Sequence, residues 1–260
     1  MDSIDFSVRD RVAYAVLDRP DSLNAIDESV LDGLESVLTT IRDGADVRAL
    51  VITGRGDAFC VGLDLQLLQR AFDDLDYFRA VLLRYNQVLL DLEALDVPVV
   101  AAVNGTTRAG GFELALACDL VLIADEARIA DHHTHFGMLP GGGASQRAPR
   151  KLGDQRAKQL LFTAGWLTGP EAVAAGLALR SVPAAELDAA VEDLVSQLRT
   201  KSRACLGTLK YLIADGSQLP MTEAVSLEVE RFMDYMHTYP DGHEGFHAYL
   251  EGRPPSWAAD

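Results

Sequence analysis

The chain has 260 residues and a mass of 28.1 kDa, which suits one large domain or one domain with a small appendage. Its 23 Lys and Arg against 39 Asp and Glu give a net charge of −16, which leaves no basic face broad enough to bind a nucleic acid backbone. With 48% hydrophobic and 24% charged residues the composition is that of a folded protein, and no stretch reaches the roughly 18 apolar residues of a membrane span.

The N-terminal residues and the cysteines indicate the compartment. The first 20 residues carry charges every few positions and lack the apolar centre of a secretory signal, so we expect a cytoplasmic protein. The three cysteines, Cys60, Cys118 and Cys205, are far apart and form no C-x-x-C pair. This favours reduced, buried thiols over a disulfide framework or a zinc site.

The chain opens with a pattern typical of a hairpin followed by a helix. Phe6–Arg9 and Val12–Leu17 have strand-like composition and flank a short charged turn. After a turn-rich loop, apolar residues recur at helical spacing over Ile26–Arg42, with Asp21 or Asp27 available as a cap.

Three short apolar runs are typical of buried strands that lead into loops. They are Val47–Thr53, Val97–Val103 and Leu120–Ala124. Helical patterns lie between and after them, at residues 114–118, 155–163, 170–175, 184–200 and 221–238. The alternation predicts an α/β domain with largely parallel strands, and the part after Asp154 reads as almost wholly helical. We therefore expect an α/β core over residues 1–200 and a helical region over 201–260.

Two glycine-centred turns, Phe59–Asp64 and Arg108–Glu113, each follow a predicted buried strand. At the second turn a helix begins, and its first N–H groups have no partner inside the helix. Glycine lets a substrate approach the backbone closely, so one N–H from each turn would form an oxyanion hole. The alternative is that both turns are only tight strand-to-helix connections.

Glu113 lies in the first turn of that helix, directly before an apolar stretch. Such a carboxylate commonly does no more than complement the helix dipole. If the turn binds a substrate, the same carboxylate stands beside the anion site and can move a proton.

The segment 130–143 holds three of the six histidines and a run of three glycines. On a strand, His133 and His135 would share a face as a possible metal pair, but the only local third ligand is Asp131. The favoured interpretation is that these histidines line a pocket or lie on the surface, so no metal site is predicted. The glycine run lacks the residues of a P-loop and the spacing of a dinucleotide fingerprint, and the chain has no G-x-S-x-G nucleophile elbow.

Six motifs in order resemble the crotonase superfamily, of the enoyl-CoA hydratase/isomerase type, over nearly the whole chain. They are Arg19-Pro-x-x-x-Asn-Ala25; Phe59-Cys-x-Gly-x-Asp64; Val103-Asn-Gly105 with Ala109-Gly-Gly-x-Glu113; Pro140-Gly-x-Gly143 with Gln146-Arg147; Leu167-Thr-Gly-x-Glu-Ala172 with Gly176-Leu177; and Glu244-Gly-x-x-Ala-x-Leu-Glu-Gly-Arg-x-Pro255. The resemblance implies a spiral of ββα units with a C-terminal helical trimerisation region. It also implies homo-trimers or hexamers, a coenzyme A thioester as substrate and no separate cofactor.

The resemblance also implies roles for individual residues. The thioester oxygen would be held by the N–H groups of Leu63 and Gly110, and Glu113 matches the first of the two glutamates that the family's hydratases usually have. The position of the second glutamate is occupied by His133, whose imidazole can also exchange a proton at neutral pH or can simply line the pocket. Residues expected to contact coenzyme A or substrate, besides Leu63 and Gly110, are Arg19, Ala25, Val61, Gly62, Asp64 and, as a second phosphate contact, Arg253.

Three functions remain open at this point. The first is reversible hydration of a 2-enoyl-CoA. The second is another enolate reaction, namely isomerisation, decarboxylation or thioester hydrolysis, because His133 replaces a carboxylate. The third is a catalytically degenerate acyl-CoA binder. The apolar segment Leu65–Val81 would lie near the acyl tunnel by family position, although core packing explains its residues equally well.

Overall fold

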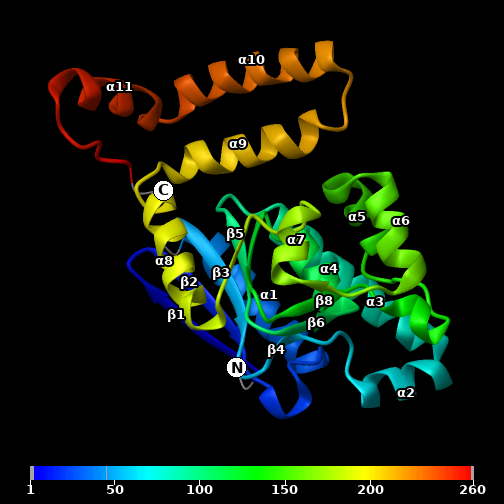
Figure 1. Cartoon of the computed structure of the whole chain (residues 1–260). Helices are drawn as coiled ribbons and strands as arrows, with labels where there is room; N and C mark the ends of the chain where they lie inside the picture. Colours follow the sequence, from blue (N-terminus) through cyan, green and yellow to red (C-terminus); the bar gives the residue numbers. More distant parts are fainter. Residues whose placement is uncertain (1–2, 45, 259–260) are drawn as a thin grey trace.

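Two β-sheets organise the chain, which is described here from a computed structural model over residues 3–44 and 46–258 (Figure 1). The larger sheet has the strand order β1-β2-β3-β5-β7-β10, and the smaller one has the order β4-β6-β8-β9. The larger sheet comprises β1 (Ile4–Arg9), β2 (Val12–Leu17), β3 (Ala49–Gly54), β5 (Val99–Val103), β7 (Leu120–Ala124) and β10 (Arg180–Val182). The smaller sheet comprises β4 (Ala58–Cys60), β6 (Thr106–Arg108), β8 (Arg128–Ala130) and β9 (Leu167–Thr168).

The strands alternate between the two sheets along the chain. In each of three successive units, β3 with β4, β5 with β6 and β7 with β8, the first strand joins the larger sheet and the second joins the smaller one. These strands pair in parallel within each sheet, and every residue of β5 is buried, as expected for strands covered on both faces. The predicted spiral of ββα units is confirmed.

Helices follow the strand pairs and cover the sheets. The α-helices are α1 (Glu28–Arg42), α2 (Leu65–Asp73), α3 (Leu75–Glu93), α4 (Gly110–Ala117), α5 (Ala144–Leu152), α6 (Asp154–Thr163), α7 (Gly169–Ala174), α8 (Leu187–Leu198), α9 (Arg203–Gly216), α10 (Met221–Thr238) and α11 (Asp241–Glu251). Three short 3₁₀ helices are η1 (Pro20–Ser22), η2 (His133–Phe136) and η3 (Ala184–Glu186). No helix in the described ranges is long and apolar enough to cross a membrane.

The N-terminal hairpin is confirmed, and its turn explains its register. Asp10 and Arg11 have φ values of 48° and 64°, the left-handed pair that a two-residue turn needs between twisted strands. The following helix begins at Glu28, two residues later than the periodicity indicates, because the side chain of Asp27 accepts a hydrogen bond from the Val30 amide at 3.0 Å. Asp27 is therefore its cap, and Asp21 lies in η1.

Two expectations for the second half of the chain were wrong. It is not almost wholly helical, since β9 pairs with β8 and β10 pairs with β7, completing one edge of each sheet. These strands have two and three residues, too few to show a periodicity. The cysteines also differ, because Cys60 and Cys118 are buried as expected whereas Cys205 is exposed on α9.

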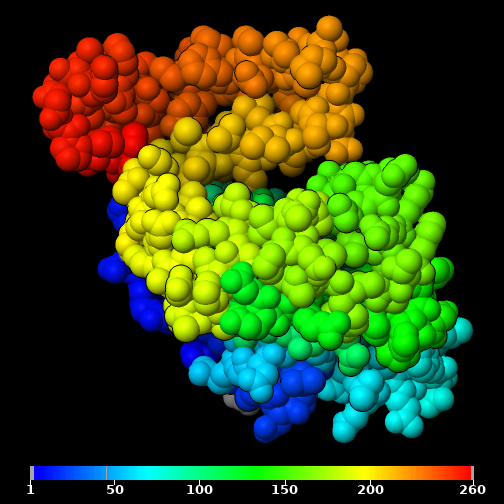
Figure 2. Space-filling model, viewed as in Figure 1, coloured from blue at the N-terminus to red at the C-terminus, as the bar shows by residue number. Residues whose placement is uncertain are grey.

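The C-terminal helices stand apart from the sheets. In Figures 1 and 2, α9 and α10 run side by side and α11 extends beyond them. Two ion pairs join α9 to the sheets and helices below it, one between Arg203 and Asp96 at 2.9 Å and one between Lys210 and Asp119 at 2.7 Å. By contrast, α10 has no buried residue over its 18 positions. The division between residues 1–200 and 201–260 falls in the turn before α9 and stays a prediction.

Candidate active site

Three segments that are far apart in sequence meet at the ends of β4 and β6. The Ile26 amide donates to the Gly62 carbonyl at 2.8 Å, and the Asp64 amide donates to the Ile26 carbonyl at 2.9 Å. Gly62 has a φ of +92°, and a methyl group placed on it would lie 2.9 Å from the Gly110 amide nitrogen. The two glycine-centred turns predicted from the sequence are therefore in contact.

The amides of Leu63 and Gly110 are the predicted pair of donors. Within the described part of the chain, neither N–H donates to a protein acceptor. The bridge between Ile26 and Leu63 is formed by hydrogen bonds of Gly62 and Asp64, so it does not use the Leu63 N–H, and Gly110 is the first residue of α4. The N–H groups of a helix's first turn have no intrahelical acceptor. Two unpartnered donors on adjoining backbone segments are what an oxyanion site requires.

Glu113 is held next to this backbone by the glycine run of the fourth motif. The residue is 2% exposed, and its Oε1 accepts hydrogen bonds from the Gly142 amide at 2.7 Å and the Ala144 amide at 3.1 Å. A methyl group on Gly142 would lie 2.7 Å from the Glu113 carboxyl carbon, so a larger residue there would displace the carboxylate or the loop. Burial raises the pKa of Glu113 to about 7, although the charge of His133 and the two amides oppose the rise.

His133 lies in η2, the short helix that follows β8. Its Nδ1 is 3.0 Å from Oδ1 of Asp131, and its side chain is 13% exposed. Burial lowers the pKa of His133, but the hydrogen bond and charge of Asp131, together with the charge of Glu113, outweigh burial and raise it. The mutual effects of Glu113 and His133 on each other's pKa indicate that the two groups share one electrostatic environment.

Helix α3 supports both the glycine run and the start of α4, which the sequence did not indicate. The Tyr85 hydroxyl donates to the Gly110 carbonyl, and the Asn86 amide donates to the Gly141 carbonyl at 2.7 Å. Arg147 forms two hydrogen bonds to Glu93, at 2.7 and 2.8 Å, and a third to the Gly142 carbonyl at 2.8 Å. Of the supporting side chains, those of Tyr85, Asn86, Glu93 and Arg147, only Arg147 belonged to a motif. Its pairing with Glu93 across some fifty positions left no trace in the local pattern.

Of the predicted coenzyme A contacts, Arg19, Ala25 and Val61 lie beside the same turns, whereas Arg253 follows α11. The Arg19 guanidinium donates to the Ala25 carbonyl at 2.5 Å and pairs with Asp64 at 3.2 Å and Asp27 at 3.1 Å, so it fastens the first loop to the second. Ala25 is buried, and Val61 is partly exposed. Arg253 lies at the end of α11, where it pairs with Glu244.

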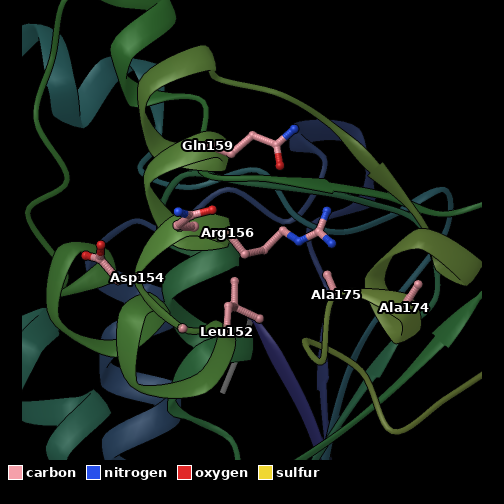
Figure 3. Close-up of a pocket in the computed structure, with 8 residues that line it drawn as sticks. Leu152, Asp154, Arg156, Gln159, Ala174 and Ala175 are labelled. Atoms are coloured by element: carbon pink, nitrogen blue, oxygen red, sulfur yellow. The ribbon is translucent and has the colours of Figure 1, made fainter.

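The other histidines and the pocket in Figure 3 lie outside this arrangement. His133 and His135 are in a 3₁₀ helix rather than a strand, and His135 stacks on His132 with ring centres 4.6 Å apart. Residues 3–44 and 46–258 contain no group of three side chains able to hold a metal ion. The pocket in Figure 3 is lined by residues of α5, α6 and α7, among them Arg156, Gln159 and Ala174, and by none of the predicted site residues.

Comparisons with known proteins show the family of the chain. The family model described as enoyl-CoA hydratase/isomerase matches residues 8–260. A crotonyl-CoA hydratase of Syntrophomonas wolfei is 32% identical over 94% of this chain and 93% of its own, and a carnitinyl-CoA dehydratase of Proteus mirabilis is 32% identical over 98% of each.

A solved structure supports the same assignment. The crystal structure of an enoyl-CoA hydratase from Bacillus anthracis superimposes with a TM-score of 0.94 at 30% identity, covering 99% of this chain and 100% of that one. Its fold is thus the fold built above from alternating strands. The chain belongs to the enoyl-CoA hydratase/isomerase family of the crotonase superfamily.

Proposed function

We propose that the protein catalyses the reversible addition of water to a 2-trans-enoyl-CoA. The observation that carries this proposal is the pair of unpartnered amides, of Leu63 and Gly110, on adjoining backbone beside the buried carboxyl of Glu113. Two relatives support it. One is named a crotonyl-CoA hydratase and the other a carnitinyl-CoA dehydratase, and both names describe the addition or removal of water on a coenzyme A thioester.

The chemistry needs one anion site and two proton transfers. Water loses a proton as its oxygen bonds to the β-carbon, and the electron pair of the double bond moves to the thioester oxygen. The amides of Leu63 and Gly110 would stabilise that enolate oxygen, and each such donor contributes about 3–4 kcal/mol to the transition state. A proton delivered to the α-carbon completes the 3-hydroxyacyl-CoA, and the reverse steps remove water.

Glu113 suits one of these transfers. A carboxyl whose pKa lies at about 7 can give or take a proton at neutral pH at comparable cost. His133, whose pKa is raised in the same environment mainly because Asp131 outweighs the effect of burial, suits the other transfer. Arg19 and Arg253 as phosphate contacts, and the backbone of Ala25 and Val61 at the adenine, remain part of the proposal by resemblance.

A second enolate reaction, isomerisation of the double bond, is favoured by one observation. By the resemblance to the family, His133 stands where a second carboxylate would be, and a different proton carrier there would change where the proton is delivered. Isomerisation takes a proton from one carbon and returns it to another without adding water, so the product mass distinguishes it from hydration.

The test combines turnover with product mass. The purified protein is mixed with enoyl-CoAs of short and medium chain length, and the absorbance of the conjugated thioester is followed. We expect the absorbance to fall and a product one water heavier to form. Glu113→Gln should lower kcat by about 10²–10⁴-fold, the usual contribution of a positioned acid or base, while Glu186→Gln, an exposed carboxylate of η3, should not change it.

Two outcomes would redirect the assignment. A product of unchanged mass would identify an isomerase. Acyl-CoA binding measured by calorimetry, without turnover of any chain length, would identify the degenerate binder. Loss of a measurable turnover in Glu113→Gln excludes that last case.

We also propose that the protein assembles as a trimer or hexamer through its C-terminal helices. On α10 the apolar side chains of Val225, Val229, Phe232 and Met233 recur on one face and are between 47% and 58% exposed. A contiguous apolar helix face of this kind is typical of a surface covered in the assembled protein.

A further inference from the structure

Asp131 is a fully buried carboxylate that lies between the two halves of the site. It directly follows β8, and its relative exposure is 0%. Its carbonyl accepts a hydrogen bond from the Ala109 amide at 3.0 Å, which ties it to the residue before the Gly110 donor. Its side chain contacts His133, two residues later in the chain.

Both hydrogen bonds of the Asp131 side chain are with His133. Oδ1 lies 3.0 Å from the His133 ring nitrogen Nδ1, and Oδ2 accepts from the His133 amide at 3.4 Å. Within residues 3–44 and 46–258, no other group hydrogen-bonds to this carboxylate. Burying a carboxylate costs free energy unless the carboxylate is paired. For Asp131, the contact with His133 is what offsets this cost.

The contact with Asp131 affects which nitrogen of the His133 ring carries a proton. A neutral imidazole carries its proton on one nitrogen and a lone pair on the other, and the partner of one nitrogen decides which is which. An ionised carboxylate only accepts hydrogen bonds, so Nδ1 must be the donor toward Asp131. The nitrogen left to exchange a proton with a ligand is then Nε2.

We propose that Asp131 is a positioning residue that keeps the proton of His133 on Nδ1 and fixes the ring, so that Nε2 is the second proton-transfer atom of the site beside Glu113. This inference rests on the proposed enolate chemistry for its kinetic consequence. The tautomer itself is a property of the protein without substrate.

The protons balance whether Glu113 or His133 accepts the proton of water. If Glu113 takes the proton of water, protonated Nε2 gives its proton to the α-carbon. If neutral Nε2 takes the proton of water, protonated Glu113 gives its proton to the α-carbon. In each case a proton returns between the two groups to restore the starting state, and the Nδ1 proton stays with Asp131.

The contact also explains why an aspartate at position 131 is compatible with a histidine at position 133. A carboxylate side chain at position 133 would lie near the buried Asp131 carboxylate, and neighbouring like charges repel each other. An imidazole removes that repulsion because it donates instead. Asp131 therefore suits an imidazole at position 133 better than a carboxylate.

The kinetic test is a double-mutant cycle of Asp131→Asn and His133→Gln. The Asn side chain keeps the size of Asp131, and the backbone bond to Ala109 is unchanged. We expect Asp131→Asn to lower kcat by about 10–100-fold with KM changed by less than about twofold, a part of the 10²–10⁴-fold that a general acid or base contributes. In the His133→Gln background, Asp131→Asn should have no further effect on kcat. Asp188→Asn, on the exposed face of α8, is the matched control and should leave kcat unchanged.

The tautomer is measured without turnover. In protein labelled with ¹⁵N-histidine, the nitrogen shifts of His133, assigned by their loss in His133→Gln, should show Nδ1 protonated in the neutral ring of the wild type and a changed tautomer ratio in Asp131→Asn. Unchanged shifts in Asp131→Asn, or an equal fall in kcat with and without His133, would overturn the positioning role. If the protein turns over no enoyl-CoA, the shifts alone decide, so failure of the proposed function and failure of this inference are distinguishable.

Discussion

Glu113 and His133 lie in the same site but are held in different ways. Glu113 is fixed by two backbone amides of the 141–144 segment, which α3 and Arg147 brace from behind. His133 is fixed mainly by one side chain, Asp131, and sits in a short 3₁₀ helix that is partly open to solvent. A carboxylate held by backbone depends on the shape of a loop, whereas an imidazole held by a carboxylate depends on one replaceable residue.

The largest expected effect is on stability and concerns the burial of Glu113. Because its pKa is raised from 4.5 to about 7, the folded protein keeps the proton over a pH range in which the unfolded chain has lost it. The stabilisation is complete below about pH 4.5 and is lost as the pH rises through 7, a loss of about 3 kcal/mol at 1.36 kcal/mol per pKa unit.

The measurement is urea unfolding at several pH values. The free energy of unfolding of Glu113→Gln, relative to wild type, should rise by about 3 kcal/mol between pH 4.5 and 8, since the amide does not ionise. The same difference for the exposed Glu186→Gln should stay flat. A flat difference for Glu113→Gln as well would mean that the carboxyl ionises freely in the folded protein.

The next largest effect is expected when the backbone that holds Glu113 is disturbed. In Gly142→Ala the new methyl group would lie 2.7 Å from the Glu113 carboxyl carbon, so either the carboxylate or the loop must move. We expect kcat for enoyl-CoA hydration to fall about 100-fold, the cost of misplacing a reacting group by about 1 Å. Gly216→Ala, where the nearest atom is 3.9 Å away, is the control in the same steady-state assay. Full activity in Gly142→Ala would show that the loop yields without disturbing Glu113.

A smaller effect comes from the brace behind the loop. Arg147→Lys keeps the charge but loses the paired hydrogen bonds to Glu93, because an ammonium group has no planar fork. We expect kcat to fall about tenfold through a displaced Gly142, with the His133 tautomer unchanged. Arg180→Lys alters an exposed ion pair with Asp193 and serves as the control. A changed His133 signal in Arg147→Lys would show that the two regions are not independent.

The smallest effect on turnover is expected far from both regions. Phe232→Asp places a charge on the exposed apolar face of α10, so we expect light scattering to report a smaller assembly than for wild type. Leu63, Gly110, Glu113 and His133 all lie outside α10, so kcat per chain should change by less than about twofold. Glu230→Gln, away from the centre of that face, should keep the wild-type mass. An unchanged mass for Phe232→Asp would exclude this face as the contact.

The sequence predicted the elements whose signal lies within a few neighbouring residues. The apolar runs that became β3, β5 and β7, the hairpin turn and the two glycine-centred turns each carry their signal within a few residues. The contact between Gly62 and Gly110 followed because parallel strands bring their carboxyl ends to one edge.

What the sequence could not predict depends on long-range contacts or on elements too short for a pattern. Tyr85 and Asn86 lie on α3 among residues that would equally suit core packing, and their partners, Gly110 and Gly141, are 25 and 55 positions away. The role of Asp131 depended on the chain turning into η2 rather than continuing as a strand, which His132 makes possible with a φ of +61°. The strands β9 and β10 were too short to recognise.

Ala109, the residue before the Gly110 donor, has a φ of +48° and a ψ of −118°, a conformation that a residue with a side chain adopts only when its surroundings impose it. The bond from its amide to the Asp131 carbonyl is one such constraint. Because the fold already bears this strain without a ligand, the Gly110 amide needs no backbone rearrangement to meet the thioester oxygen of the proposed substrate. The proposed anion site is thus preorganised, and we expect ligand binding there to change the backbone little.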